Sequence, residues 1–156
     1  MGTASLIASA VGILLLVVTA YVLVGGTIMT AEVVTLAQQD SFHAGEARMR
    51  TAISITNTTV NLTTSTLSFD MRNTGGEIIG DFDHMDVFVA TGGVPLRCPQ
   101  GTGGGTWSLS SIEPDDIHPS RLDPDEVAII AVAYTGTPPT WVKASTSTGV
   151  SASAYV

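Results

Sequence analysis

The chain has few basic residues, and this shortage excludes one large class of function. Six Lys and Arg side chains stand against fourteen Asp and Glu among 156 residues, which gives a formal net charge of −8 at pH 7. Proteins that bind nucleic acids need a basic face to neutralise phosphates, and anionic lipid headgroups attract clusters of basic residues in the same way. We therefore expect no nucleic-acid partner and no polybasic lipid-binding patch.

Cysteine and charge are also scarce. Cys98 is the single cysteine, so it forms no internal disulfide and builds no cysteine-rich zinc site. Charged residues make up only 13% of the chain, whereas apolar residues make up 44%. This composition is unusual for a soluble enzyme and typical of a chain with a membrane segment. We expect no enzymatic activity, no cofactor and no small-molecule substrate.

The N-terminal segment has no charged side chain before Glu32. A helix needs about 20 apolar residues to cross the hydrocarbon core of a bilayer, and this segment is longer. A buried core helix of such length would show a polar face, and a cleaved secretory signal would open with basic residues and carry a shorter apolar run. We therefore predict an uncleaved membrane helix over 1–31. Its anchoring side chains are Leu6, Ile7, Ile13, Leu14, Leu15, Leu16, Val17, Val18, Val22, Leu23, Val24 and Ile28.

Residues 32–50 contain no proline and one glycine, Gly45. Their apolar residues have helical spacing, so we predict that the membrane helix continues as a helical stalk, with a rise of about 1.5 Å per residue. We expect Gly45 to weaken or end this helix. His43 is expected to be a solvated or interface residue rather than a ligand.

From Thr51 onward the periodicity changes from helix to strand. Segments in which apolar and polar residues alternate are separated by turn clusters such as Asn73-Thr74-Gly75-Gly76. Strands are predicted over 52–56, 67–71, 85–89, 107–112, 127–134, 141–144 and 150–156. This pattern is typical of an immunoglobulin-like β-sandwich, so we predict a mainly β domain over 51–156. Its strand aromatics are expected in the core: Phe69, Phe88, Trp107, Tyr134 and Trp141.

Two groups of acidic residues stand out in the predicted loops. The first has Asp81, Asp83 and Asp86 around His84; the second contains Glu113, Asp115, Asp116, Asp123, Asp125 and Glu126. Calcium accepts carboxylate oxygens at flexible geometry, but no EF-hand spacing is present and Asp is a common turn residue. We expect solvated turns and no metal site, with a structural calcium site as the alternative. Although His84 and His118 have Ser and Asp available for a catalytic triad, no Gly-x-Ser-x-Gly elbow accompanies them, so no catalytic residue is assigned.

Two Asn-x-Ser/Thr sequons lie near the start of the predicted sandwich. Asn57-Thr58-Thr59 and Asn61-Leu62-Thr63 make Asn57 and Asn61 candidate N-glycosylation acceptors. The N-terminal side carries no Lys or Arg for the positive-inside rule to count. Because that rule does not decide the orientation, we use the sequons and the abundance of Thr, Ser and Gly instead. They favour a C-terminal domain that lies outside the cell membrane.

A membrane helix, a helical extension and an external sandwich form a pilin-like layout. The chain resembles the archaellum accessory proteins FlaF and FlaG, the stator components of the archaeal swimming filament. The resemblance spans the whole chain and rests on the Met1-Gly2 opening, a stalk with Gln38, Gln39, Glu46 and Arg48, and the segments 51–57, 69–75, 85–89 and 122–126. The Met-Gly opening favours the FlaF side. Pro124-Asp125-Glu126 departs from the Pro-Gly-Glu that family members often carry.

The resemblance implies a non-enzymatic structural protein of the motility machinery. It would sit in the cell membrane with its sandwich in the pseudoperiplasm, bind surface-layer protein and other archaellum components, and self-associate, for instance through an exposed edge strand. The closest alternative is an archaellin or type IV pilin-like subunit that polymerises into an extracellular filament. Against it, no prepilin peptidase site precedes the apolar run, and position 5 holds Ser5 rather than Glu. A membrane-tethered binding or enzyme domain is a further alternative.

Overall fold

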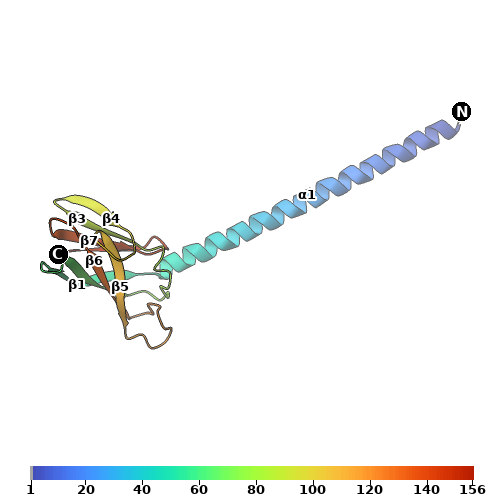
Figure 1. Ribbon diagram of the computed structural model, residues 1–156. Coiled ribbons are helices and arrows are strands. Elements are labelled where there is room, and N and C mark those ends of the chain that lie inside the picture. Colours follow the sequence, from blue (N-terminus) through green and yellow to red (C-terminus); the bar gives the residue numbers. More distant parts are fainter. Residues whose placement is uncertain (1) are drawn as a thin grey trace. The chain divides into compact units, whose positions relative to one another are not determined.

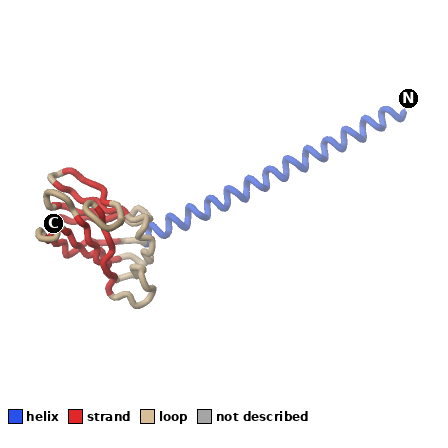
Figure 2. Tube along the Cα trace, viewed as in Figure 1, coloured by secondary structure: helices blue, strands red, loops and turns tan. Residues whose placement is uncertain are grey.

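Residues 2–156 form one long helix and eight strands. The computed structural model describes residues 2–156, with all of their side chains except those of Ala4 and Ser5, so Met1 of the predicted anchor lies outside the described residues. Two compact units are present, Met1–His43 and Ala44–Val156. Helix α1 (Gly2–Arg50) makes up the first unit and its last turns belong to the second, which also contains every strand (Figures 1 and 2).

Helix α1 is unbroken from Gly2 to Arg50, as the prediction of a membrane helix with a helical stalk requires. The helix does not end at Gly45, so that part of the expectation is wrong. A single glycine in a helix costs only about 1 kcal/mol relative to alanine, and Ala44, Glu46 and Ala47 beside it are strong helix formers. The helix instead ends where Thr51 donates its backbone N–H to Ala47 O at 3.0 Å.

The second unit is a sandwich of two antiparallel sheets, which confirms the predicted fold class. One sheet has the order β1-β2-β6-β5 and the other β4-β3-β7-β8. The strands are β1 (Ile53–Asn61), β2 (Thr66–Asn73), β3 (Asp86–Thr91), β4 (Val94–Cys98), β5 (Thr106–Glu113), β6 (Val127–Ala133), β7 (Pro139–Ser145) and β8 (Ser151–Tyr155).

Strand β4 has no counterpart among the predicted strands. It contains Pro95, and proline lacks the N–H that a central strand must donate. The strand forms because it lies at the edge of its sheet, where one side of the backbone needs no partner. It is joined to β3 by Gly92 and Gly93, which both have positive φ, as the tightest hairpin turns require.

The core lies between the two sheets and follows the alternation of the strands. Leu67, Phe69 and Met71 of β2 are fully buried, whereas the residues between them are not. Trp107 and Tyr134 are also buried, as predicted. The prediction is wrong for Phe88 and Trp141, which are only half-buried. They occupy the opposite parity from buried neighbours on the same strands, so they lie on the outer face of their sheet.

The turn after β2 fastens the last turn of α1 to the sandwich. Gly76 donates its N–H to Arg50 O at 2.8 Å, and Gly75 donates to Ala52 O at 3.1 Å. A Cβ atom at Gly75 would overlap the backbone of Arg50 and Ala52, so only glycine fits there. Fully buried Asn73 holds the turn, since its Oδ1 accepts from Gly75 N at 3.0 Å.

Candidate functional site: an apolar helix and two unlike sheet faces

All of the anchoring side chains predicted on α1 are exposed. Leu16, for example, has 70% of its surface accessible, and the same is true to a similar degree of the other eleven residues predicted for the anchor. Among the described residues, α1 is the one helix whose length and composition allow it to cross a membrane. A helix that is apolar on every side is suited to hydrocarbon rather than to water.

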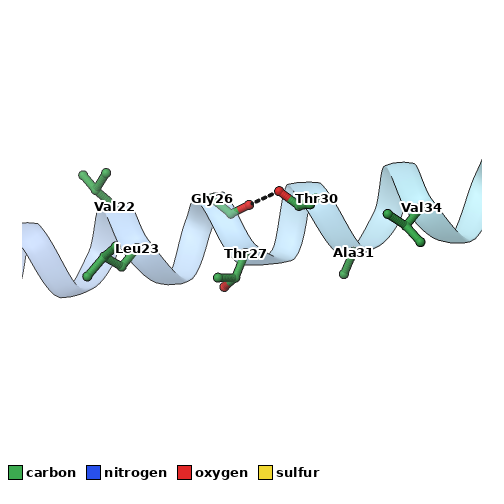
Figure 3. Close-up of a pocket in the computed structure, with 7 residues that line it drawn as sticks. All are labelled: Val22, Leu23, Gly26, Thr27, Thr30, Ala31 and Val34. Carbon is green, nitrogen blue, oxygen red and sulfur yellow. Dashed lines mark hydrogen bonds between the residues drawn. The ribbon is translucent and has the colours of Figure 1, made fainter.

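Hydroxyl groups within α1 bond to the backbone of the helix itself. Thr19 Oγ1 donates to Leu15 O at 2.9 Å, and Thr30 Oγ1 donates to Gly26 O at 2.9 Å. Figure 3 shows the second of these bonds beside a shallow groove, where small residues lie between larger ones. Hydrocarbon offers no partner to a hydroxyl, so internal bonding makes these polar residues compatible with a membrane.

The outer face of the second sheet carries aromatic and basic side chains. We call this the aromatic face; it comprises Phe88, Arg97, Trp141, Lys143 and Tyr155. The register places Phe88 between Arg97 and Lys143, and Trp141 opposite Tyr155. Tyr155 is 84% exposed. Two of the six basic residues of an acidic chain therefore lie beside half-buried or exposed rings, which is the composition of a contact surface.

The outer face of the first sheet is different. We call it the hydroxyl face; it includes Ser54, Thr56, Thr59, Ser68 and Ser108, which lie on the outward parity of β1, β2 and β5. Hydroxyl side chains of this kind are depleted at the centres of protein interfaces and common on solvated surfaces. The same face also carries Asp70, Arg72 and Ile129 but no aromatic ring among the described residues, so the two outer faces of the sandwich differ in aromatic content.

The four sheet edges differ in how much backbone they leave free for pairing with another chain. Strands β1 and β8 lie against each other, and Thr58 Oγ1 donates to Tyr155 O at 2.9 Å. The start of β5 is covered because Trp107 N donates to Pro99 O at 3.0 Å, and its register shifts farther along. Strand β4 remains, and Pro95 removes a donor from it. These are the devices by which sandwiches avoid edge-to-edge association.

The first acidic group is divided between separate partners. Asp81 Oδ1 lies 2.8 Å from His84 Nδ1, and this hydrogen bond holds the pKa of Asp81 below its usual value and the pKa of His84 above it. Asp86 accepts from Arg97 Nε at 2.7 Å, and Asp83 is exposed. These carboxylates therefore stabilise turns and strand ends one at a time.

The second acidic group fastens the loop between β5 and β6. Asp123, only 2% exposed, accepts from the backbone N–H of His118 at 3.0 Å and lies 2.8 Å from its Nδ1. Glu126 accepts from Asp123 N at 2.9 Å, and Asp115 accepts from Ser120 N at 2.9 Å. In residues 2–156, no three His, Cys, Asp or Glu side chains are placed to hold a metal ion.

The rings of the two histidine–aspartate pairs have no bonded nucleophile among residues 2–156. Within the described part of the chain, no serine or threonine hydroxyl is hydrogen-bonded to the ring of His84 or His118. Cys98 is buried in the core, and burial raises the pKa of its thiol, which suppresses the thiolate form that reacts. Both sequon asparagines, Asn57 and Asn61, lie exposed on β1.

A shallow groove in the second unit lies beside the last turns of α1. Its lining includes Gly45 and Arg48 of the helix and Asp81, Ser147 and Thr148 of two turns. Arg48 and Asp81 are the charged groups, and Asp81 is already bonded to His84. The polar lining of the groove consists of these two charged groups and the hydroxyls of Ser147 and Thr148.

Residues 4–155 match the family model described as archaeal-type flagellin. The chain belongs to the archaeal-type flagellin family. The match extends from the apolar helix to the last strand, so it includes both units of this family member. A comparison with curated protein sequences finds no match.

Solved structures match the fold of this family member. The archaellum periplasmic stator protein FlaG from Sulfolobus acidocaldarius aligns with a TM-score of 0.54 and 18% identity, over 68% of this chain and 99% of that one. The archaellum periplasmic stator protein complex of FlaF and FlaG from the same organism aligns with a TM-score of 0.51 and 17% identity, over 67% and 87% of the two chains. The predicted resemblance to these proteins is confirmed, and at such identities it establishes the fold.

The aromatic face is a candidate interaction surface that sequence reasoning missed. A single sequence shows alternation along a strand but does not reveal which parity faces the opposite sheet when both carry large residues. The sequence of β3 does contain an indication of this face. Phe88 stands between Val87 and Val89, and the two valines are the residues buried in the core.

Proposed function

We propose that this protein is a non-enzymatic subunit of the archaellum motor, of the FlaF or FlaG type, that anchors the stator by binding the surface layer and by self-association. The observation that carries the proposal is the combination of an exposed apolar helix with a sandwich that aligns over 99% of the FlaG stator chain. The alignment of the sandwich with the FlaF and FlaG complex also supports archaellum components as partners.

The proposed mechanism needs three properties and no catalysis. The residues of α1 over 6–28 hold the chain in the cell membrane. The turn at Gly75 and Gly76 resists rotation of the last helical turn against β1, because backbone atoms are in direct contact there. The sandwich then transmits a lateral load from its partner to the anchor. We place the sandwich outside the membrane, in the pseudoperiplasm.

The aromatic face is our candidate for the surface-layer contact. Large rings supply contact area at low entropy cost, and Lys143 favours an acidic partner, whereas Arg97 is already paired with Asp86 at 2.7 Å. The register and partial exposure of Phe88, Trp141 and Tyr155 support this assignment. We propose that self-association also uses a sheet face, since the edges of the sandwich are covered, bulged or interrupted by proline.

Fractionation of native cells tests the proposal. Filaments are sheared from the cells, and mass spectrometry measures this protein in the filament and envelope fractions. A stator subunit is expected only in the envelope fraction and at low copy number. Recovery as a bulk filament component would overturn the stator assignment.

A filament subunit is the second candidate function. The family match over residues 4–155 favours it, since that family is described by its flagellin members. In that case the apolar helix would pack against its copies in a filament core rather than against lipid. The two candidates differ in abundance and location, which the fractionation measures directly.

A binding experiment tests the contact surface separately. Membrane-embedded protein carrying Trp141→Ser and Lys143→Glu should lose most of its co-sedimentation with isolated surface-layer protein. The matched control is Ser68→Glu on the hydroxyl face, which should leave co-sedimentation unchanged. Equal binding by both variants would remove the aromatic face from the proposal.

A further inference from the structure

The two sequons share strand β1 but differ in their surroundings. Asn57 lies at a β-bulge with a φ of 51°. Its Nδ2 donates to Asp70 Oδ2 at 2.7 Å. Hydrogen bonds to charged groups are stronger than those between neutral groups, and this one involves the same nitrogen atom that would carry a glycan.

The residues that follow Asn57 are held in place by the sandwich. Thr58 Oγ1 donates to Tyr155 O at 2.9 Å, and Thr59 pairs with Ser68 in the β1–β2 ladder. An enzyme that binds this sequon in the folded protein must therefore lift β1 away from both β2 and β8. The sequon at Asn57 is therefore held in the folded sandwich by contacts with two other strands.

Asn61 is the last residue of β1, and the rest of its sequon lies in the turn before Thr66. Asn61 Oδ1 accepts from Thr63 N at 2.9 Å and from Thr64 N at 3.2 Å, so the carboxamide is oriented by its oxygen alone. Within the described residues, Asn61 Nδ2 and the Thr63 hydroxyl make no hydrogen bond. Leu62 between them is 71% exposed.

We propose that Asn61 is N-glycosylated and that Asn57 is not. The step joins Asn61 Nδ2 to the anomeric carbon of a sugar carried on a lipid phosphate. The bond from that carbon to the phosphate oxygen breaks, the lipid phosphate leaves with the electron pair, and Nδ2 loses one proton to a base of the transferring enzyme. Acceptor sequons are found on surface loops, and the turn at Asn61 is the sequon that meets this condition.

The assignment has a consequence for assembly. Two residues separate α1 from strand β1, which runs to Asn61, so the modified turn lies at the end of the sandwich away from the junction at Arg50 (Figure 1). A bulky hydrophilic group there keeps that end in solvent. The proposal rests on the proposed function in one respect, since it requires the sandwich to lie outside the membrane.

The test uses full-length protein purified from native membranes. Both sequons fall in the one tryptic peptide between Arg50 and Arg72, so fragmentation that localises the modified residue is needed. We expect the sugar mass on Asn61 alone. Asn61→Gln should abolish the modification, whereas Asn57→Gln should leave its stoichiometry unchanged.

Two variants at Thr63 test whether a loss of modification reflects the sequon itself rather than misfolding. Thr63→Val keeps the backbone N–H that bonds Asn61 Oδ1 but removes the sequon hydroxyl, so modification should disappear. Thr63→Ser keeps the hydroxyl and should retain it. A sugar on Asn57 with Asn61 bare, or modification that survives Thr63→Val, would overturn the assignment.

Protease treatment of intact cells separates this proposal from the proposed function. If an external protease digests the sandwich but Asn61 is unmodified, the glycosylation proposal fails and the external location stands. If the sandwich is protected in intact cells and digested only after lysis, the proposed location fails first, and the assignment of Asn61 fails with it.

Discussion

The two units of the chain use large apolar side chains in opposite ways. Along the helix these side chains are exposed, as Leu16 and Leu23 illustrate with 70% and 69% accessible surface, whereas Phe69 and Trp107 in the sandwich are completely buried. Val, Leu and Ile make up 16 of the 43 residues of the first unit and 22 of the 113 residues of the second, so the units differ in composition as well as in spacing. A run without polar interruptions has no side to turn toward water, while strict alternation provides one buried and one solvated face.

The largest expected effect comes from opening the core. Phe69→Ala should lower the free energy of unfolding of the sandwich by about 3–5 kcal/mol, because it removes a fully buried ring and leaves a cavity. The matched control is Phe88→Ala on the aromatic face, which should cost about 1 kcal/mol or less. Urea denaturation of a fragment over 32–156, followed by tryptophan fluorescence, measures both. Equal losses would contradict the assignment of the two faces.

A charge introduced into α1 tests whether its exposed apolar side chains lie in a membrane. Leu16→Lys should raise the free energy of membrane insertion by about 2.5–3.5 kcal/mol, because the ammonium group loses its hydration in the bilayer centre. Less protein should then remain in membranes after alkaline carbonate extraction. Ser68→Lys on the hydroxyl face adds the same charge and should leave extraction unchanged. If Leu16→Lys is retained like the parent protein, the helix does not span the membrane at this position.

The junction between helix and sandwich should respond to a single methyl group. Gly75→Ala places a Cβ atom against the backbone of Arg50 and Ala52, and such overlap typically costs about 1–3 kcal/mol. Gly76→Ala is the control, because a Cβ at Gly76 has no neighbour within 4 Å. Thermal unfolding of the 32–156 fragment compares the two variants. A Gly76→Ala variant that is equally destabilised would show that the close approach at Gly75 is not the cause.

The smallest effect is expected at the exposed pair Asp81 and His84. Their hydrogen bond places the pKa of His84 above 6.5 and the pKa of Asp81 below 3.8. The contribution of His84 to stability is therefore complete below pH 6.5 and is lost as the pH rises through the raised pKa. The contribution of Asp81 is present above pH 3.8 and is lost as the pH falls through the lowered pKa.

Asp81→Asn removes the charge that favours the protonated ring, so the pKa of His84 should fall toward 6.5. A titration of the ring protons by NMR measures the pKa directly. Because both side chains are exposed, solvent and salt screen the pair, and the midpoint of urea unfolding should hardly change. An unaltered pKa of His84 in Asp81→Asn would exclude the hydrogen bond as the cause of its shift.

Sequence patterns predicted the elements well wherever they depended on local periodicity. The apolar helix, its extension to Arg50, the sandwich class and seven of the eight strands follow from spacing along the chain. Strand β4 was missed because Pro95 argues against a strand unless the strand is known to lie at an edge. Gly45 was misjudged because a weak local preference was given more weight than the helix formers beside it.

The candidate interaction surfaces depended on pairing between distant segments. Phe88 and Trp141 have the same residue types as the core aromatics, and only the register of β3 with β7 places them together on the outer face. The two sequons are equivalent as motifs, and they differ in the partners of their carboxamides. Asp70 on the neighbouring strand accepts from Asn57 Nδ2, whereas in the described part of the chain the Asn61 carboxamide accepts only from backbone N–H groups of its own turn. Likewise, the need for glycine at position 75 arises from the approach of Arg50, which lies far away in the sequence.

The sequence by itself determined where this protein is apolar without interruption and where it alternates, because these periodicities are properties of neighbouring residues. That was sufficient for an anchor helix and a sandwich. The tertiary structure decided which parity of each strand faces the core, which edges are covered and which turn remains free. Those outcomes depend on contacts between residues distant along the chain, and packing two sheets together selects one arrangement among those that the local pattern allows.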